Sequence, residues 1–181
     1  RRRQRGRAMN GLAILLAFFF AGQEAPPASH PRITRAALAT IEKSCDGRFA
    51  RSYDSFDLLG ATRGVYLEGY GAVFSTELNL FLSPNISPFH QSFTSIEKTR
   101  IHDRKVQRLP LLKQQMRELL IASAASLENL PPGEQVVLAV TLFHYSWEDY
   151  SGLPSQVVMQ AERQKLLSNA TRETAIRTVE F

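Results

Sequence analysis

Residues 64–82 read Gly-Val-Tyr-Leu-Glu-Gly-Tyr-Gly-Ala-Val-Phe-Ser-Thr-Glu-Leu-Asn-Leu-Phe-Leu, and this stretch decides the fold. From residue 72 onward the side chains alternate, and one side of the segment carries Ala72, Phe74, Thr76, Leu78, Leu80 and Leu82. A period of two with a single apolar face is typical of a half-buried antiparallel strand. The segment Gly69-Tyr70-Gly71 predicts a tight turn to the apolar residues 64–67. We therefore expect a β-hairpin here.

Helical patterns flank this hairpin. A helix that starts near Pro31 and ends near Cys45-Asp46-Gly47 is expected from apolar residues at helical spacing, which are Ile33, Ala37, Leu38 and Ile41. Ser95 is expected to cap a second helix, which Pro110 should kink or restart. Beyond Pro110, a helical stripe carries Leu112, Met116, Leu119, Leu120, Ser123 and Leu127.

The C-terminal part is predicted to complete the sheet. Residues 136–143 would place apolar side chains on both faces of a strand, which predicts a central strand covered on both faces. Residues 156–160 and 176–181 are expected as further strands, and residues 163–167 as a short helix. The order of these elements predicts an α+β fold, with a small, mainly antiparallel sheet that contains the β-hairpin and is backed by helices.

The N-terminus carries a targeting pattern. Five arginines within residues 1–7 precede an apolar run over residues 11–22, which together predict a secretory signal peptide over residues 1–22. Residues 23–30 are expected to form a Pro-rich linker, and residues 31–181 a single domain. The alternative is an uncleaved N-terminal anchor, through which alone we expect any membrane contact. Periplasmic or extracellular localisation follows from the export signal.

Composition argues against several classes of function. Residues 1–7 hold five of the 22 Lys and Arg residues, and the remaining 17 equal the 17 Asp and Glu residues. Because a nucleic-acid partner requires a basic surplus, none is expected. The glycines at 60–71 lack the pattern of a phosphate loop, so no nucleotide site is expected. The single Cys45 gives no disulfide framework, the histidines are scattered, and we expect neither metal nor cofactor.

The best candidate site follows the predicted central strand. Residues 144–150 gather titratable and aromatic side chains, and the candidate site residues are His144, Trp147, Glu148, Asp149 and Tyr150. An imidazole next to carboxylates suits acid–base chemistry, and aromatic rings suit stacking against a sugar or a peptide. The alternative is an aromatic loop that caps the core, with both carboxylates in solvent. The sequence identifies no catalytic residue.

Two functions fit these observations. The first is an exported bacterial envelope protein with a non-enzymatic binding domain, whose partner is a protein or a cell-envelope polymer. The second is a small envelope hydrolase that uses His144 with Glu148 or Asp149. A charged block could also hold an anionic lipid or a cell-wall polymer, or simply form a solvated helix face. Its basic residues are Lys98, Arg100, Arg104, Lys105 and Arg108.

Overall fold

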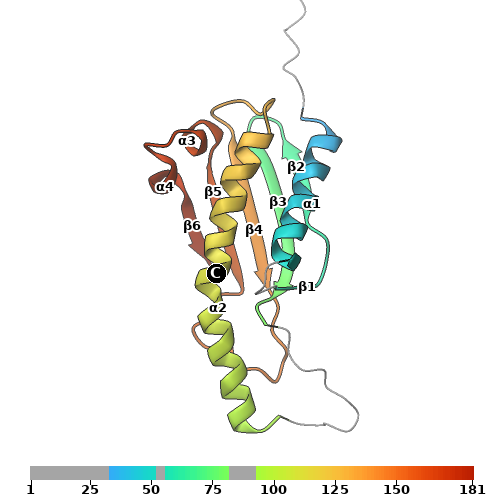
Figure 1. The fold of residues 1–181 in the computed structure, drawn as a ribbon, viewed down its shortest axis with the longest axis vertical. Coiled ribbons are helices and arrows are strands. Elements are labelled where there is room, and N and C mark those ends of the chain that lie inside the picture. The colour runs from blue at the N-terminus through green and yellow to red at the C-terminus, as the bar shows by residue number, and fades with distance from the viewer. Residues whose placement is uncertain (1–32, 52–55, 82–92) are drawn as a thin grey trace, which may run out of the picture.

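The computed structural model describes residues 33–51, 56–81 and 93–181 (Figure 1). These residues form an α+β fold around one apolar core, which confirms the fold class predicted from the sequence. The predicted signal peptide and linker lie outside the described residues, as does Pro31.

A mixed sheet of six strands forms one layer. The strands are β1 (Asp57–Leu58), β2 (Arg63–Leu67), β3 (Gly71–Asn79), β4 (Gln135–Leu142), β5 (Gln156–Glu162) and β6 (Arg177–Glu180). Their order is β1-β3-β4-β5-β6, and β2 pairs with the same side of β3 as β1. Four of the five pairings are antiparallel, and β3 and β4 are parallel. The sheet is thus mainly antiparallel, as predicted.

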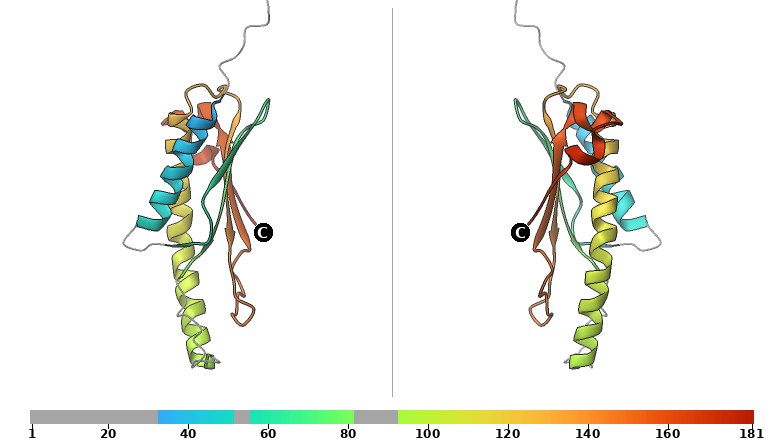
Figure 2. Two further views of the ribbon diagram at one scale, coloured as in Figure 1. Left: turned by 90° about the vertical axis from the view of Figure 1, so that its right-hand side faces the viewer. Right: turned by 90° about the vertical axis from the view of Figure 1, so that its left-hand side faces the viewer.

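The helices α1 (Arg35–Arg51) and α2 (Ser95–Ser126) form the second layer, and the short α3 (Arg163–Leu167) and α4 (Arg172–Ala175) precede β6. Figure 2 shows that α1 and α2 lie on one face of the sheet. The long α2 connects the parallel strands β3 and β4, because parallel neighbours need a crossover that returns the chain to the same end of the sheet. Its N-terminal half extends beyond the sheet (Figure 1).

The predicted hairpin is confirmed. The strands β2 and β3 pair with Val65 opposite Val73, and the Tyr70 N–H donates to the Leu67 carbonyl at 3.0 Å across the turn. Phe74 and Leu78 are buried against the helices, and the alternate residue Ser75 is exposed. Gly71 has a φ of 143°, and a Cβ there would lie 1.9 Å from the backbone oxygen of Gln135. Only glycine therefore fits this end of the hairpin.

Both long helices differ from their predictions, the first in its end and the second in its cap and its continuity. The first continues past Gly47 to Arg51, since Phe49 is buried and packs edge-on against Phe56 with ring centroids 6.2 Å apart. The second runs without interruption through Pro110 and is capped by Thr94 rather than Ser95. Pro110 is exposed, so water can bind the carbonyl that the missing N–H leaves unpaired.

The strand β4 is central, as predicted, but the described helices cover only one of its faces. Val136, Leu138 and Val140 belong to the core shared with α1 and α2, whereas on the other face Val137 is buried at 5% exposure and Thr141 is exposed. In the part of the chain that the structure describes, helices cover only one face of β4, although Val137 on the other face is also buried. The apolar run reflects a second apolar surface on the outer face of the sheet.

Candidate functional site

The loop between β4 and β5 holds the predicted site residues beside the N-terminal half of α2. The backbone leaves β4 at Leu142, and the Phe143 N–H donates to the Leu78 carbonyl at 2.9 Å. At its far end the loop is tied by the Leu142 N–H to the Ser155 carbonyl at 2.8 Å. The base of the loop is therefore fixed by main-chain hydrogen bonds on the central strands.

A buried ion pair anchors this loop to α2. The Lys105 ammonium group contacts the Glu148 carboxylate, and the two side chains are only 1% and 3% exposed. The same ammonium group donates to the Phe143 carbonyl at 3.4 Å. Burial lowers the pKa of Lys105, and the contact with Glu148 offsets this effect in part. Charges removed from water need such a partner, so the pair fixes the loop on the helix.

His144 lies next to this pair without joining it by a hydrogen bond. Its Nδ1 is 3.9 Å from Oε2 of Glu148 and has no hydrogen-bond partner among the described residues. Its Nε2 faces the Pro154 carbonyl at 3.4 Å. Burial is the main cause that lowers the pKa of His144, and Lys105 lowers it further, whereas the Pro154 carbonyl and Glu148 raise it. The imidazole is therefore neutral at pH 7.

Aromatic rings form a continuous stack along the loop. Trp147 stacks on Phe93 with ring centroids 4.3 Å apart, and Tyr145 stacks on Trp147 with ring centroids 5.4 Å apart. Phe143 meets Tyr145 edge-on at 4.9 Å. Trp147 is half-buried and Tyr145 is 37% exposed. The stack thus reaches from the base of the loop to the residue that precedes the α2 cap.

Asp149 and Tyr150 lie on the exposed side of the loop. The Asp149 carboxylate accepts the Ser151 N–H at 2.9 Å, and hydrogen bonds from the side chain and then the backbone of Ser151 lower the pKa of Asp149. The Asp149 backbone carbonyl lies 2.9 Å from Nδ1 of His102 on α2. Tyr150 is 59% exposed, and its ring stacks on His144 with centroids 5.6 Å apart. Of the five predicted residues, His144 lies close to both Glu148 and Tyr150, and Trp147 belongs to the aromatic stack. The Asp149 carboxylate bonds within its own turn and takes no part in this group.

The arrangement is poorly suited to hydrolysis. A general base must reach the proton that it abstracts. The Glu148 carboxylate is buried in its ion pair with Lys105. The Asp149 carboxylate accepts a backbone hydrogen bond from its own turn. His144 has neither carboxylate at hydrogen-bond distance from its Nδ1. The loop instead presents exposed ring faces on a fixed base, which suits recognition.

Two contributors were missed in the sequence. Lys105 was grouped with a charged block, yet it follows Ile101 and precedes Leu109 at four-residue spacing, on the buried stripe of α2. That spacing was the available signal. No sequence pattern pointed to Phe93, because its neighbours in the sequence do not indicate that its ring stacks on Trp147. The predicted charged block does not form one face, because Lys105 is buried and the Arg108 guanidinium lies 5.1 Å from the Phe56 ring centroid.

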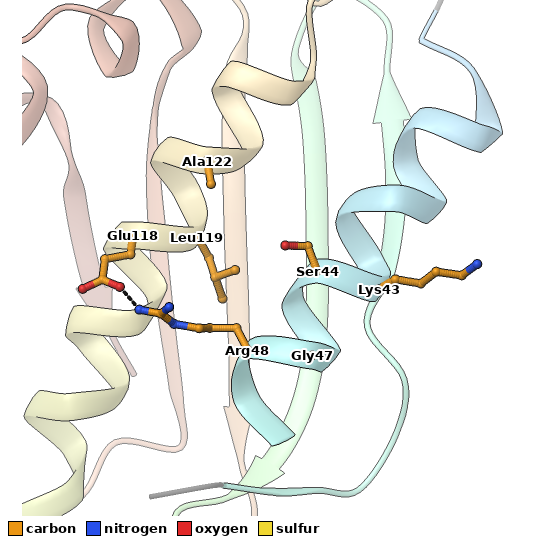
Figure 3. A pocket seen from close by; sticks show the side chains of 7 residues that line it. All are labelled: Lys43, Ser44, Gly47, Arg48, Glu118, Leu119 and Ala122. Atoms are coloured by element: carbon orange, nitrogen blue, oxygen red, sulfur yellow. Dashed lines mark hydrogen bonds and ion pairs between the residues drawn. The ribbon is translucent and has the colours of Figure 1, made fainter. Parts of the chain in front are cut away.

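A second concave region lies between α1 and α2. This cleft of about 380 Å³ is lined by Ser44, Gly47, Leu119 and Ala122, and the Arg48–Glu118 ion pair crosses it (Figure 3). Ser44 points toward α2, whereas Lys43 points away from it. Both partners of the ion pair are about half exposed. An exposed pair of this kind contributes little, and the cleft holds no buried polar group that would recognise a ligand.

Residues 33–51, 56–81 and 93–181 contain neither a cluster of metal ligands nor a helix fit to cross a membrane. In these ranges no three His, Cys, Asp or Glu residues are grouped so as to hold a metal ion. Across the same ranges, none of the helices combines the length and the hydropathy that a membrane crossing requires.

No protein-family model matches the chain, and neither a curated protein nor a solved structure shows significant similarity to it. Its function is therefore inferred from its own side chains.

Proposed function

We propose that this protein is an exported protein of the bacterial envelope that binds a protein or an envelope polymer, without catalysis, through the loop after β4. The observation that carries the proposal is the aromatic stack of Phe93, Trp147 and Tyr145 on a loop that the Lys105–Glu148 pair anchors. Exposed rings on a rigid scaffold favour binding, because little side-chain conformational entropy is lost when the partner binds.

Exposed rings supply the contact surface in this proposal. Tyr150 is 59% exposed and stacks on His144, and Tyr145 is 37% exposed and stacks on the half-buried Trp147. The indole Nε1 of Trp147 is buried without a hydrogen-bond partner among the described residues. A buried donor of this kind costs about 1–3 kcal/mol, and such groups call for a functional explanation.

Export is supported by the sequence alone. The basic head, the short apolar run and the Pro-rich residues 23–30 follow the order of a secretory signal. The near balance of acidic and basic residues after residue 7 favours a protein or polymer partner over a nucleic acid.

The test is co-sedimentation of the purified protein with isolated envelope membranes and cell-wall material. Tyr150→Ala and Trp147→Ala should each lower the bound fraction at least about tenfold, since aromatic anchors carry a large share of binding energy. The matched control is Tyr70→Ala, which removes a tyrosine of similar exposure from the β2–β3 turn. Tyr70→Ala should bind like the parent. Equal binding by all variants would overturn the proposal.

A hydrolase would give a different pattern. In that case His144→Ala would abolish release of fragments from envelope material while leaving co-sedimentation unchanged. The binding proposal predicts no fragment release by the parent protein. Fractionation with N-terminal sequencing tests export separately, and a full-length chain found only in the cytoplasm would contradict it.

A further inference from the structure

The two edge strands of the sheet differ in whether their outward main-chain groups are bonded. On β2, the Gly64 N–H donates to the Glu42 carboxylate at 2.6 Å, and the Gly64 carbonyl accepts the Arg35 guanidinium at 3.1 Å. The N–H of Thr62, just before β2, donates to the Asp46 carboxylate at 2.8 Å. Side chains of α1 therefore occupy the positions that a further strand would need on this side of the sheet.

The opposite edge strand, β6, has no such cover within the described residues. The Phe181 N–H donates to a carbonyl of β5 at 3.1 Å, so Phe181 faces β5. Main-chain groups alternate along a strand, so Val179 also faces β5, and Thr178 and Glu180 face outward. No described strand pairs with this outward side of β6. The right-hand view of Figure 2 looks onto this edge, where β6 stands in front of the other strands.

An extended polypeptide suits this open edge. Outward N–H and C=O groups are the template for a further strand, which gains main-chain hydrogen bonds whatever its sequence. Strand addition needs only local alignment with β6, so it follows the twist of the sheet. The four residues of β6 are too few for a stable homodimer interface, which needs about 1,200 Å² or more, but they match a short peptide segment.

The edge of β6 continues into the loop after β4. The N–H of Ser155, at the end of this loop, donates to the Phe181 carbonyl at 2.7 Å. The loop lies beyond the C-terminal end of β6 (Figure 1). Because residues 150–155 span at most about 18 Å, a bound segment that passes Phe181 can reach the exposed ring of Tyr150. One segment can therefore contact both the open edge and the aromatic loop.

Side chains along β6 indicate which segment fits. On the outer face, Arg177 is exposed and forms no ion pair with another described residue. Val179 follows on the same face, and Phe181 after it is 67% exposed. On the helix side, Glu180 is already paired with Lys113 of α2 at 2.6 Å. An acidic side chain next to Arg177, with apolar ones further along the outer face, therefore complements this edge.

We propose that the partner of this protein is itself a protein, and that an extended segment of it, with an acidic side chain next to Arg177, pairs with β6 as a further strand. This inference rests on the proposed function, because the bound segment continues from β6 to the rings of the loop after β4. It also selects between the two partner classes, since a polysaccharide lacks the regular N–H and C=O groups that strand pairing requires.

A proline at an outward position tests the pairing. Thr178→Pro removes one outward N–H, while the hydrogen bonds to β5 come from the alternate residues and remain. The fraction of protein that co-sediments with isolated envelope membranes should fall at least about tenfold for this variant, because the added strand loses a donor and meets the proline ring. The matched control Thr178→Val keeps the N–H and should bind like the parent.

The charge and the partner class are tested separately. Arg177→Glu should lower the bound fraction at least about tenfold, since it would repel the acidic side chain of the segment. The matched control Arg63→Glu changes an exposed arginine on β2, the other edge strand, and should bind like the parent. Digestion of the membranes with proteinase K before mixing should abolish binding of the parent, because the partner is a protein.

Amide hydrogen exchange decides the matter if Thr178→Pro fails to fold. In the parent bound to envelope membranes, the amides of Thr178 and Glu180 should exchange at least about tenfold more slowly than in the unbound protein, since both become hydrogen-bonded. The amide of Tyr66 faces outward on β2, two residues after Gly64, and its exchange should not change.

Several results would overturn the proposal. Binding of Thr178→Pro at the level of the parent, or unchanged exchange at Thr178 and Glu180, would mean that no strand is added to β6. Binding that survives proteinase K would make the partner a polymer. Parent-like binding of Arg177→Glu would contradict the acidic segment. A dimer of the purified parent that Thr178→Pro dissociates would show that a second copy occupies the edge.

Failure of the proposed function has a different signature. It appears as unchanged binding of Tyr150→Ala and Trp147→Ala, whatever Thr178→Pro does. If those two variants lose binding and Thr178→Pro does not, the loop is the binding surface and the strand addition is wrong. A parent that does not bind envelope membranes contradicts both.

Discussion

The ammonium group of Lys105 and the carboxylate of Glu148 form an ion pair beyond the reach of solvent, although the two residues are 43 positions apart. The pair joins the N-terminal half of α2 to the loop after β4. Desolvation opposes its formation, so its net contribution is small while both partners are present. Removal of one partner leaves a charge buried without compensation, and this asymmetry can be measured.

Lys105→Met should lower the free energy of unfolding by about 3–5 kcal/mol, since the Glu148 charge would then be buried alone. The double variant Lys105→Met/Glu148→Leu should recover most of this loss, because no charge remains. Urea unfolding measures both values. Lys165→Met removes the exposed partner of Glu162 and should cost under about 1 kcal/mol. Equal losses for the buried and exposed pairs would show that Glu148 is hydrated in the protein.

Acidification should destabilise the protein through His144. The unfolded imidazole titrates near pH 6.5, and burial lowers the pKa of His144 in the folded protein. Between these two pKa values the unfolded state binds more protons, so stability falls as the pH drops below about 6.5. His144→Gln should therefore show a smaller fall in Tm between pH 7.5 and 5.5 than the parent. Parallel pH profiles for the two proteins would contradict the lowered pKa.

The two faces of β3 should respond differently to truncation. Phe74 is 1% exposed within the core, so Phe74→Ala should cost about 3–5 kcal/mol of unfolding free energy. Ser75 lies on the exposed face, and Ser75→Ala should cost under about 0.5 kcal/mol. Chemical denaturation of both variants provides the comparison. Similar losses at both positions would mean that the strand register is shifted by one residue.

The β2–β3 turn provides a matched pair of glycines. Gly71→Ala should cost more than about 3 kcal/mol, because the new Cβ would overlap the backbone of Gln135 at a φ that only glycine adopts freely. Gly69 also has a positive φ, of 78°, but a Cβ there meets nothing within 4 Å. Gly69→Ala should cost only about 1 kcal/mol. Thermal melts of the two variants test the difference, and a mild Gly71→Ala would argue against the close approach of β4.

Local patterns predicted the parts of the fold that depend on neighbouring residues. The alternation around Phe74 and Leu78 fixed the buried face of β3, since side chains in a strand alternate whatever the strand pairs with. The helix α3 was predicted with the bounds that the structure has, Arg163–Leu167. The parallel pairing of β3 with β4 was not predicted, because it joins segments on either side of a 32-residue helix.

Helix continuity also depended on surroundings that the sequence does not display. Pro110 lacks the N–H that would continue the helix, yet its position on the exposed side lets water replace the lost bond. Gly47 did not end α1, because the burial of Phe49 stabilises one further turn. Tertiary packing outweighed the local signal at Gly47, and exposure to water did so at Pro110.

The candidate loop was found because it follows the most apolar strand and concentrates polar and aromatic side chains. Its internal geometry was not predictable in the same way. The partner of Glu148 is on α2, and the ring that stacks on Trp147 is Phe93, just before that helix. Which loop residues are buried depends on contacts with segments far away in the sequence. The residues next to the loop in the sequence do not reveal these contacts.

Site-specific photo-cross-linking in living cells tests the central claim, that the loop after β4 is the binding surface. A photoreactive phenylalanine analogue would replace Tyr150 in one variant and Tyr70 in another, since both tyrosines are largely exposed at opposite ends of the sheet. Our account predicts an adduct of higher mass, with protein or envelope polymer, from position 150 and none from position 70. No adduct from position 150, or equal adducts from both positions, would contradict it.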